Sequence, residues 1–193
     1  MTDQDSVEPQ YFGTRCVHAG QRPDPETGAV APPIYQTTSY AFEDAEQAAD
    51  QYALQAEGNI YSRFDNPTVR ILERRLADLE GGVDAVATGS GMAALDGITF
   101  LLAESGDNVV SASSIYGGTH SYFTKTASRR GIDARFVDTL DYDGYAEAID
   151  ENTAYVHIET IANPSLVTPD IERIAEIAHD RDVPLVVDNT FAT

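Results

Sequence analysis

The chain has 193 residues, 42% of them hydrophobic, which is enough to bury a core and too many for a disordered or fibrous chain. Its 32 acidic against 12 basic residues give a net charge of −20, which repels phosphate backbones and anionic lipids and argues against nucleic acid and membrane as partners. No stretch approaches the roughly 18–20 apolar residues of a membrane span, and the acidic start MTDQDSVEPQYFG lacks the pattern of a secretion signal, so we expect a cytoplasmic protein.

The basic residues are unevenly divided, because eleven are arginine and only Lys125 is lysine. Repulsion among so many carboxylates is weakest in concentrated salt, where screening is strong. Together with the scarcity of lysine, this charge favours a protein from a halophilic, salt-adapted organism. An ordinary acidic bacterial protein is the alternative.

Residues 1–60 are expected to form an extended N-terminal arm with one short helix, followed by a large domain over 61–193. Prolines interrupt the arm, and only 43–57 (EDAEQAADQYALQAE) has a helical pattern. Cys16 is the single cysteine, so no disulfide forms within the chain. With His18 alone it makes no zinc site, and we interpret it as a buried or incidental thiol.

A helix is predicted over 66–80. Asn66 can cap it, Pro67 suits its first position, and Gly81-Gly82 ends it. Between them, apolar residues recur at helical spacing: Val69, Leu72, Leu76 and Leu79.

Strand and helix patterns then alternate to the end of the sequence. Alternating units with apolar strands are typical of an α/β fold, a mostly parallel sheet covered by helices. The predicted strands are 84–90, 108–113, 134–139, 154–160 and 183–189, and the predicted helices are 92–102, 119–130, 142–150 and 169–180.

Ligands of such sheets bind beyond the carboxyl ends of the strands. The first segment there is the turn TGSGMAA (88–94), whose glycines allow a close approach and whose following helix offers free N–H groups, so we expect it to bind a phosphate. The turn also matches a dinucleotide fingerprint, but the next strand ends in Ser113-Ser114 rather than in an acidic residue. A turn packed for its own sake is the structural alternative.

The second segment is IYGGTH (115–120). Tyr116, at a strand end and before two glycines, can lay its ring on a planar ligand, although a core tyrosine beside a flexible turn is an equal alternative. His120 is interpreted as a surface residue at a helix start rather than as a catalytic group.

Two further strand ends carry polar residues. Asn163 precedes a proline, which holds it extended so that its amide can face a pocket. Asp188 ends an apolar strand, where its carboxylate needs a cationic partner such as a protonated pyridine nitrogen, with an arginine or a metal as alternatives. Ahead of the 66–80 helix, Tyr61 and Arg63 place a phenol near a guanidinium that could bind a phosphate.

In this order, the pieces resemble the Cys/Met-metabolism family of pyridoxal-phosphate (PLP) enzymes, which have the fold of type I aminotransferases. The matching stretches cover nearly all of 14–193: HAGQRPDPETGAVAPPIYQTTSY, GNIYSRFDNPT, LEGG, ATGSGMAAL, SIYGGTHSYF, ETIANP and VVDNTFAT. The resemblance implies pyridoxal 5'-phosphate as cofactor and a small amino acid as substrate.

The resemblance also implies site residues. The N–H groups of Gly91 and Met92 would hold the cofactor phosphate. Tyr116 would stack on the ring and could transfer a proton at the leaving-group side, and Asp188 would pair with the ring nitrogen, so these two are the catalytic candidates. Asn163 would lie near the ring hydroxyl.

Glu159 and Thr190 would lie beside the cofactor. Tyr61 and Arg63 would reach its phosphate from a neighbouring subunit, which implies a homodimer or homotetramer with shared active sites. Within the family, ETIANP, GNIYSR and FAT are most similar to O-acetylhomoserine sulfhydrylases, which implies γ-replacement of acetate by sulfide or a thiol in methionine biosynthesis. Cystathionine γ-synthase, cystathionine γ-lyase and methionine γ-lyase are the alternatives.

The family's cofactor-binding lysine lies on a strand beyond DNTFAT. The resemblance therefore implies a truncated PLP domain that stops before this lysine, with Lys125, in a predicted helix, not taking its place. We expect the chain to be inactive alone. A lysine-free pseudoenzyme subunit that lends Tyr61 and Arg63 to a complete homologue is the alternative.

Overall fold

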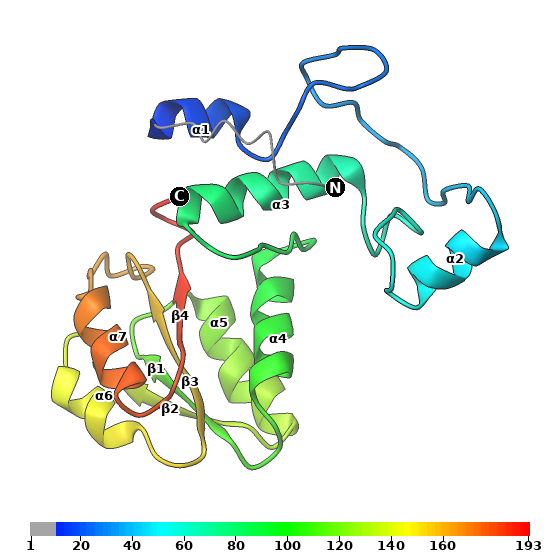
Figure 1. Ribbon diagram of the computed structural model, residues 1–193. Helices are drawn as coiled ribbons and strands as arrows, with labels where there is room; N and C mark the ends of the chain where they lie inside the picture. Colours follow the sequence, from blue (N-terminus) through cyan, green and yellow to red (C-terminus); the bar gives the residue numbers. More distant parts are fainter. Residues whose placement is uncertain (1–10) are drawn as a thin grey trace. The chain divides into compact units, whose positions relative to one another are not determined.

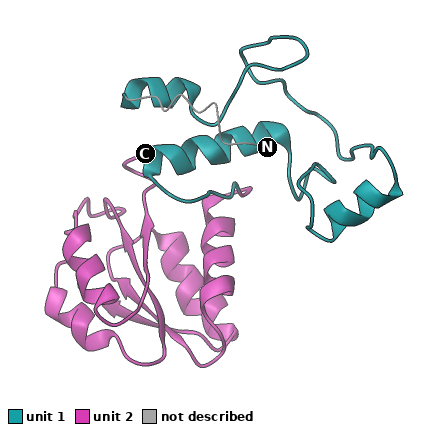
Figure 2. Ribbon diagram, in the orientation of Figure 1, with its two compact units in different colours: residues 1–87 teal, residues 88–193 magenta. Residues whose placement is uncertain are grey.

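The structure, a computed structural model, describes residues 11–193. The chain divides into two compact units, with the boundary between Ala87 and Thr88 (Figure 2). The sequence predicts another division, with an arm over 1–60 and a large domain over 61–193. That division stays a prediction.

Within its described residues, 11–87, the first unit contains three helices, α1 (Phe12–His18), α2 (Ala45–Tyr52) and α3 (Pro67–Glu80) (Figure 1). The expectation that 43–57 holds the only helix of the arm is wrong, because α1 also forms. Arg15 of α1 bonds the Asp78 carboxylate at 2.7 Å and the Asp78 carbonyl, so tertiary contact with α3 stabilises a helix too short to show a periodic pattern.

Helix α3 forms as predicted. The Asn66 side chain accepts a hydrogen bond from the N–H of Thr68 at 2.9 Å, and Pro67 takes the first position. The helix ends at Gly81, whose φ of 67° is left-handed and favours glycine. Local capping signals therefore determine both ends of this helix.

The second unit is a four-stranded parallel sheet in the order β2-β1-β3-β4, which confirms the predicted fold class. In register, Ser111 lies beside His157, and Glu159 lies beside Asp188. The carboxyl ends of the strands therefore meet at one edge of the sheet. The strands are β1 (Asn108–Ala112), β2 (Asp133–Val137), β3 (Thr153–Glu159) and β4 (Leu185–Asp188).

Helices cover both faces of this sheet. Helices α6 (Tyr142–Ala148) and α7 (Ile171–His179) lie on one side, and α4 (Gly91–Leu102) and α5 (Gly117–Ser121) lie on the other (Figure 1). Helix α5 continues as a π-helical turn, η1 (Tyr122–Ala127). The helices expected after 92, 119, 142 and 169 are all present.

The strand expected over 84–90 does not form in the structure. Within residues 11–193 it finds no strand to pair with, and Val86 is 82% exposed. Side chains of α3 hold the segment instead, since Arg70 pairs with the Asp84 carboxylate at 3.0 Å and Glu73 accepts the N–H of Ala87 at 2.7 Å. An apolar alternating pattern is insufficient where no strand partner is available.

The core of the second unit lies on both sides of the two central strands. Val110 of β1, Val156 of β3 and Ile174 of α7 are fully buried. The buried Tyr155 hydroxyl is satisfied by Thr99 of α4 at 2.7 Å. Separately, no helix within residues 11–193 is long and apolar enough to cross a bilayer.

Candidate active site

A cavity of about 360 Å³ lies at the carboxyl ends of the strands of the second unit. This volume falls within the roughly 300–1,000 Å³ of typical small-molecule sites. All four segments that the sequence predicted to follow a strand contribute to its walls, although residues 84–90, ahead of the first segment, form no strand. The lining residues are Ser90, Gly91, Met92, Leu95, Tyr116, Thr119, Glu159, Ile161, Asn163, Asp188, Thr190 and Phe191.

The first wall is the N-terminus of α4. Ser90 caps the helix by accepting the N–H of Ala93 at 3.1 Å, while the N–H groups of Gly91 and Met92 meet no acceptor among residues 11–193. A Cβ on Gly91 would meet no atom within 4 Å, so packing does not explain this glycine. Unpaired donors at a helix N-terminus, facing open space, form an anion site.

The second wall is Tyr116, which is 48% exposed and is not the core tyrosine of the alternative reading. Its ring lies close over Gly118, where a Cβ would approach the ring carbon Cε1 to 2.3 Å. The N–H of Tyr116 donates to Oε1 of Glu159 at 2.6 Å. The backbone of Tyr116 is therefore held by Glu159, and its half-exposed side chain lines the cavity.

The third wall joins β3 to the loop that follows it. Glu159 is only 5% exposed and accepts the N–H of Asn163 on Oε2 at 2.8 Å. Burial raises the pKa of Glu159 most, the N–H groups of Tyr116 and Asn163 lower it, and the Asp188 charge raises it. Asn163 lines the cavity and precedes a cis peptide bond to Pro164.

The fourth wall is Asp188, at the end of β4. Its Oδ1 accepts both the N–H of Thr190 at 3.0 Å and the Thr190 hydroxyl at 2.5 Å. Its Oδ2 accepts no hydrogen bond within residues 11–193, and no arginine or lysine of this part of the chain pairs with it. One carboxylate oxygen thus remains free for a cationic donor.

A buried histidine lies beneath this wall. The His157 ring contacts Phe123 edge to face at 5.3 Å, and its Nδ1 lies 3.3 Å from the Ser111 hydroxyl. Burial lowers the pKa of His157 to about 4, against a smaller opposing effect of the Asp188 charge. His157 is therefore neutral near neutral pH.

The structure brings seven of the nine site residues expected from sequence to this one cavity: Gly91, Met92, Tyr116, Glu159, Asn163, Asp188 and Thr190. The other two, Tyr61 and Arg63, lie in the first unit, where the Arg63 guanidinium sits 5.3 Å from the Tyr61 ring centroid. Their reach toward a phosphate stays a prediction.

Sequence reasoning did not single out five lining residues. Ser90 and Leu95 belong to the α4 wall, Thr119 follows Gly118, and Ile161 and Phe191 lie beside predicted residues. Capping marks Ser90, but apolar wall positions such as Ile161 carry no local signal that separates them from core residues.

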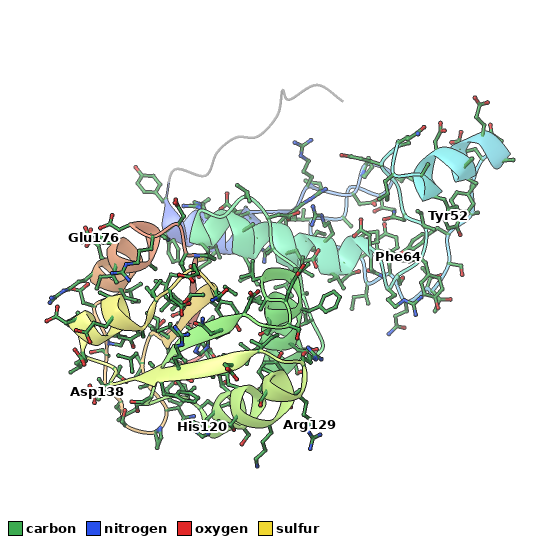
Figure 3. All side chains as sticks on the ribbon, turned by 90° about the horizontal axis from the view of Figure 1, so that it is seen from below. Tyr52, Phe64, His120, Arg129, Asp138 and Glu176 are labelled. Atoms are coloured by element: carbon green, nitrogen blue, oxygen red, sulfur yellow. The ribbon has the colours of Figure 1, made fainter. Side chains whose placement is uncertain are left out.

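Three other residues considered in the sequence analysis, His120, Lys125 and Cys16, do not line the cavity. The His120 ring is exposed on α5 (Figure 3) and stacks on Phe136 at 4.8 Å. Lys125 is exposed in η1 and does not line the cavity. Cys16 is an exposed thiol rather than a buried one. In the part of the chain that the structure describes, no cluster of His, Cys, Asp and Glu could hold a metal ion.

Known proteins are similar to this chain over nearly its whole length. The chain is 50% identical over 185 residues to the homocysteine synthase of Schizosaccharomyces pombe, a match that covers 96% of the chain and 43% of that protein. It is 45% identical over 192 residues to the O-acetyl-L-homoserine sulfhydrylase of Corynebacterium glutamicum, covering 99% of the chain and 44% of that protein. The chain thus spans less than half the length of these relatives.

A solved structure shows the same fold. A putative O-acetylhomoserine (thiol)-lyase from Campylobacter jejuni, with an N'-pyridoxyl-lysine-5'-monophosphate residue, superposes with a TM-score of 0.90 at 41% identity, over 94% of this chain and 45% of that one. The fold is therefore that of PLP-dependent enzymes. Residues 13–193 match the profile of the Cys/Met metabolism PLP-dependent enzymes. The chain belongs to this family.

Proposed function

We propose that this chain is the N-terminal part of an enzyme that replaces the acetate group of O-acetylhomoserine with sulfide or a thiol, giving homocysteine or methionine. The observation that carries the proposal is the convergence of an open anion site, an exposed aromatic face and an unpaired carboxylate oxygen on one cavity. Relatives named homocysteine synthase and O-acetyl-L-homoserine sulfhydrylase support this reaction over the cystathionine and methionine γ-lyase alternatives.

The cavity fits the family's cofactor, pyridoxal 5'-phosphate. The free N–H groups of Gly91 and Met92 would hold the phosphate. The open space in front of Gly91 leaves room for a phosphate to approach the backbone. Tyr61 and Arg63 would add a hydroxyl and a guanidinium from a neighbouring subunit.

The other end of the cavity fits the cofactor ring. Oδ2 of Asp188 would accept a hydrogen bond from the protonated ring nitrogen, while Thr190 occupies Oδ1 and fixes the carboxylate plane. The exposed face of Tyr116 would stack on the ring, and Asn163 would lie near the ring hydroxyl. Glu159 and Thr190 complete the wall next to the ring.

Bound pyridoxal phosphate supplies an electron sink that stabilises negative charge on the substrate carbons. The chain's own residues maintain that property: Asp188 keeps the proton on the ring nitrogen because its carboxylate is otherwise unneutralised. Tyr116 can hold or move a proton at the leaving-group side, and the apolar side chains of Ile161 and Phe191 line one wall.

No lysine within residues 11–193 lines the cavity, so we propose that the chain alone does not turn over substrate. The same observation supports a second candidate, a non-catalytic subunit that lends Tyr61 and Arg63 to a complete homologue. The full gene product that contains this sequence separates the two, because the first candidate requires a cofactor-binding lysine in a longer chain.

We further propose a cytoplasmic homotetramer from a salt-adapted organism. The exposed thiol of Cys16 is compatible with a reducing compartment, and the relatives are named for steps of sulfur amino-acid metabolism. Exposed apolar side chains on α4, Phe100 at 77% and Leu101 at 80%, support burial in an assembly. The net charge of −20 supports salt adaptation.

The test is an assay of the full gene product with O-acetylhomoserine and sulfide. We expect homocysteine and acetate in equal amounts, together with the visible absorbance of a bound cofactor. Two parallel assays test the family alternatives. One measures the formation of cystathionine with cysteine as the acceptor, and the other measures the breakdown of methionine. Cofactor absorbance without turnover of any of these substrates would contradict the proposed reaction, and saturable NAD binding would contradict the reading of 88–94.

A further inference from the structure

Glu159 joins the two loops that carry the polar walls of the cavity. Its Oε1 accepts the N–H of Tyr116, in the loop after β1, at 2.6 Å. Its Oε2 accepts the N–H of Asn163, in the loop after β3, at 2.8 Å. Each carboxylate oxygen therefore serves a different loop, and a single side chain sets the spacing between their backbones.

The position of this carboxylate is unusual for an acidic residue. Its side chain is almost fully buried, with 5% of the residue exposed, and no arginine or lysine of residues 11–193 pairs with it. Asp188, its register partner on β4, adds a second negative charge beside it. Burial of an unpaired carboxylate costs free energy, which here is offset by the two hydrogen bonds that it accepts.

The surrounding charged and titratable groups support this view. From β4 Asp188 faces it, from the loop after β1 Tyr116 approaches it, and on its own strand His157 is neutral near neutral pH. The backbone N–H groups are thus the main favourable partners of the Glu159 charge.

A second link between the same loops lies outside the carboxylate. The hydroxyl groups of Ser114 and Ser165 are 2.5 Å apart and more exposed. The loops are therefore joined twice, once through a buried charge and once through a neutral pair at the surface.

We infer that Glu159 is a positioning residue, which fixes the backbones of Tyr116 and Asn163 so that the ring and the amide face the cavity together. It acts through these two residues rather than on the cofactor itself. This inference rests on the proposed function only for its consequence, a lower cofactor affinity when the bridge is lost.

Two substitutions separate the parts of this role. Glu159→Gln keeps the shape but turns one acceptor into a donor, so one of the two N–H groups loses its partner. Glu159→Asp keeps the charge but is one methylene shorter, so we expect it to reach only one loop. Ser114→Ala is the matched control, because it removes the other link and leaves the carboxylate intact.

The experiment is hydrogen exchange by mass spectrometry on the full gene product, with peptides that contain Tyr116 and Asn163. Relative to the unsubstituted protein, we expect at least tenfold faster exchange of these peptides in Glu159→Gln, and of one of them in Glu159→Asp. In the Glu159 variants, the exchange rate of the β1 peptides should change less than threefold. In Ser114→Ala, the exchange rate of the peptides that contain Tyr116 and Asn163 should also change less than threefold. The exchange rate of these peptides, relative to the intrinsic rate at the same pH, should also rise as the pH falls and Glu159 becomes protonated. We expect this rise only in the unsubstituted protein.

Equilibrium dialysis with pyridoxal phosphate is the second measurement. We expect at least tenfold weaker binding in Glu159→Gln and a change within threefold in Ser114→Ala. Unchanged loop exchange in both Glu159 variants, or faster exchange with unchanged affinity, overturns the inference. If the unsubstituted protein bound no cofactor, the proposed function would be contradicted, while the exchange rates would still decide whether Glu159 holds the loops.

Discussion

Thr190 donates two hydrogen bonds to the same oxygen of Asp188, one from its N–H at 3.0 Å and one from its hydroxyl at 2.5 Å. The two residues are close in sequence, at the end of β4, so a local turn orients the carboxylate before any ligand binds. Because Oδ1 is occupied, Oδ2 is the oxygen that remains for a cationic partner. This pre-orientation lowers the entropic cost of binding.

The Thr190 hydroxyl is therefore predicted to contribute to cofactor binding. Thr190→Val keeps the shape but removes one hydrogen bond to a charged group, worth about 1.5–3 kcal/mol. We expect about tenfold or greater loss of pyridoxal phosphate affinity, measured by equilibrium dialysis. Thr190→Ser restores the donor and should bind within about threefold of the unsubstituted protein; equal affinity of the Val and Ser variants would contradict the prediction.

Gly118 is predicted to be required for the position of the Tyr116 ring. A Cβ at this position would lie 2.3 Å from Cε1 of Tyr116, so Gly118→Ala must displace the ring. At Gly117, a Cβ would meet nothing within 4 Å, which makes Gly117→Ala a matched control in the same turn. We expect Gly118→Ala to weaken cofactor binding at least tenfold and Gly117→Ala to leave it within about twofold. Equal cofactor affinities of the two variants would contradict the prediction.

His157 is predicted to make stability depend on pH. Its pKa falls from 6.5 to about 4 because it is buried, so between these values the unfolded chain binds more protons than the folded one. Stability therefore decreases as the pH falls from about 6.5 to about 4, by at most roughly 1.4 kcal/mol per pH unit and about 3 kcal/mol in total.

Urea unfolding at several pH values tests this dependence. His157→Gln should be less stable at pH 7, because the contacts with Phe123 and Ser111 are lost, but its stability should vary less across the window. His179→Gln, at an exposed position on α7, is the control and should keep the slope. An unchanged slope in His157→Gln would assign the pH dependence to other groups.

Concentrated salt is predicted to stabilise the protein. With 32 acidic and 12 basic residues, repulsion between carboxylates opposes folding at low ionic strength and is screened at high ionic strength. We expect the melting temperature in molar KCl to exceed that in dilute buffer by several degrees. No gain, or a loss, would contradict adaptation to salt.

Local signals explain the elements that sequence predicted well. Asn66 and Gly81 mark the ends of α3 because a capping amide and a left-handed glycine act within one turn of chain. The apolar runs of β1, β3 and β4 likewise placed the ends of these strands to within one residue, at Ala112, Glu159 and Asp188. Since parallel strands end at one edge, these positions predicted that Tyr116 and Asp188 would share a cavity, as the structure shows.

Contacts between distant segments explain what sequence did not predict. Helix α1 forms because Arg15 meets Asp78, and 84–90 stays irregular because it finds no partner strand among the described residues. The local sequence of α1 does not reveal its contact with Asp78. The local sequence of 84–90 does not reveal whether a partner strand lies beside it.

The sequence by itself determined the α/β order, the family and the strand-end residues, because these depend on local periodicity, turn chemistry and ordered motifs. Only the tertiary structure decided which groups satisfy one another there. It gave one oxygen of Glu159 to each of two loops and left Oδ2 of Asp188 without a partner, since hydrogen bonding between distant segments depends on three-dimensional distance and burial.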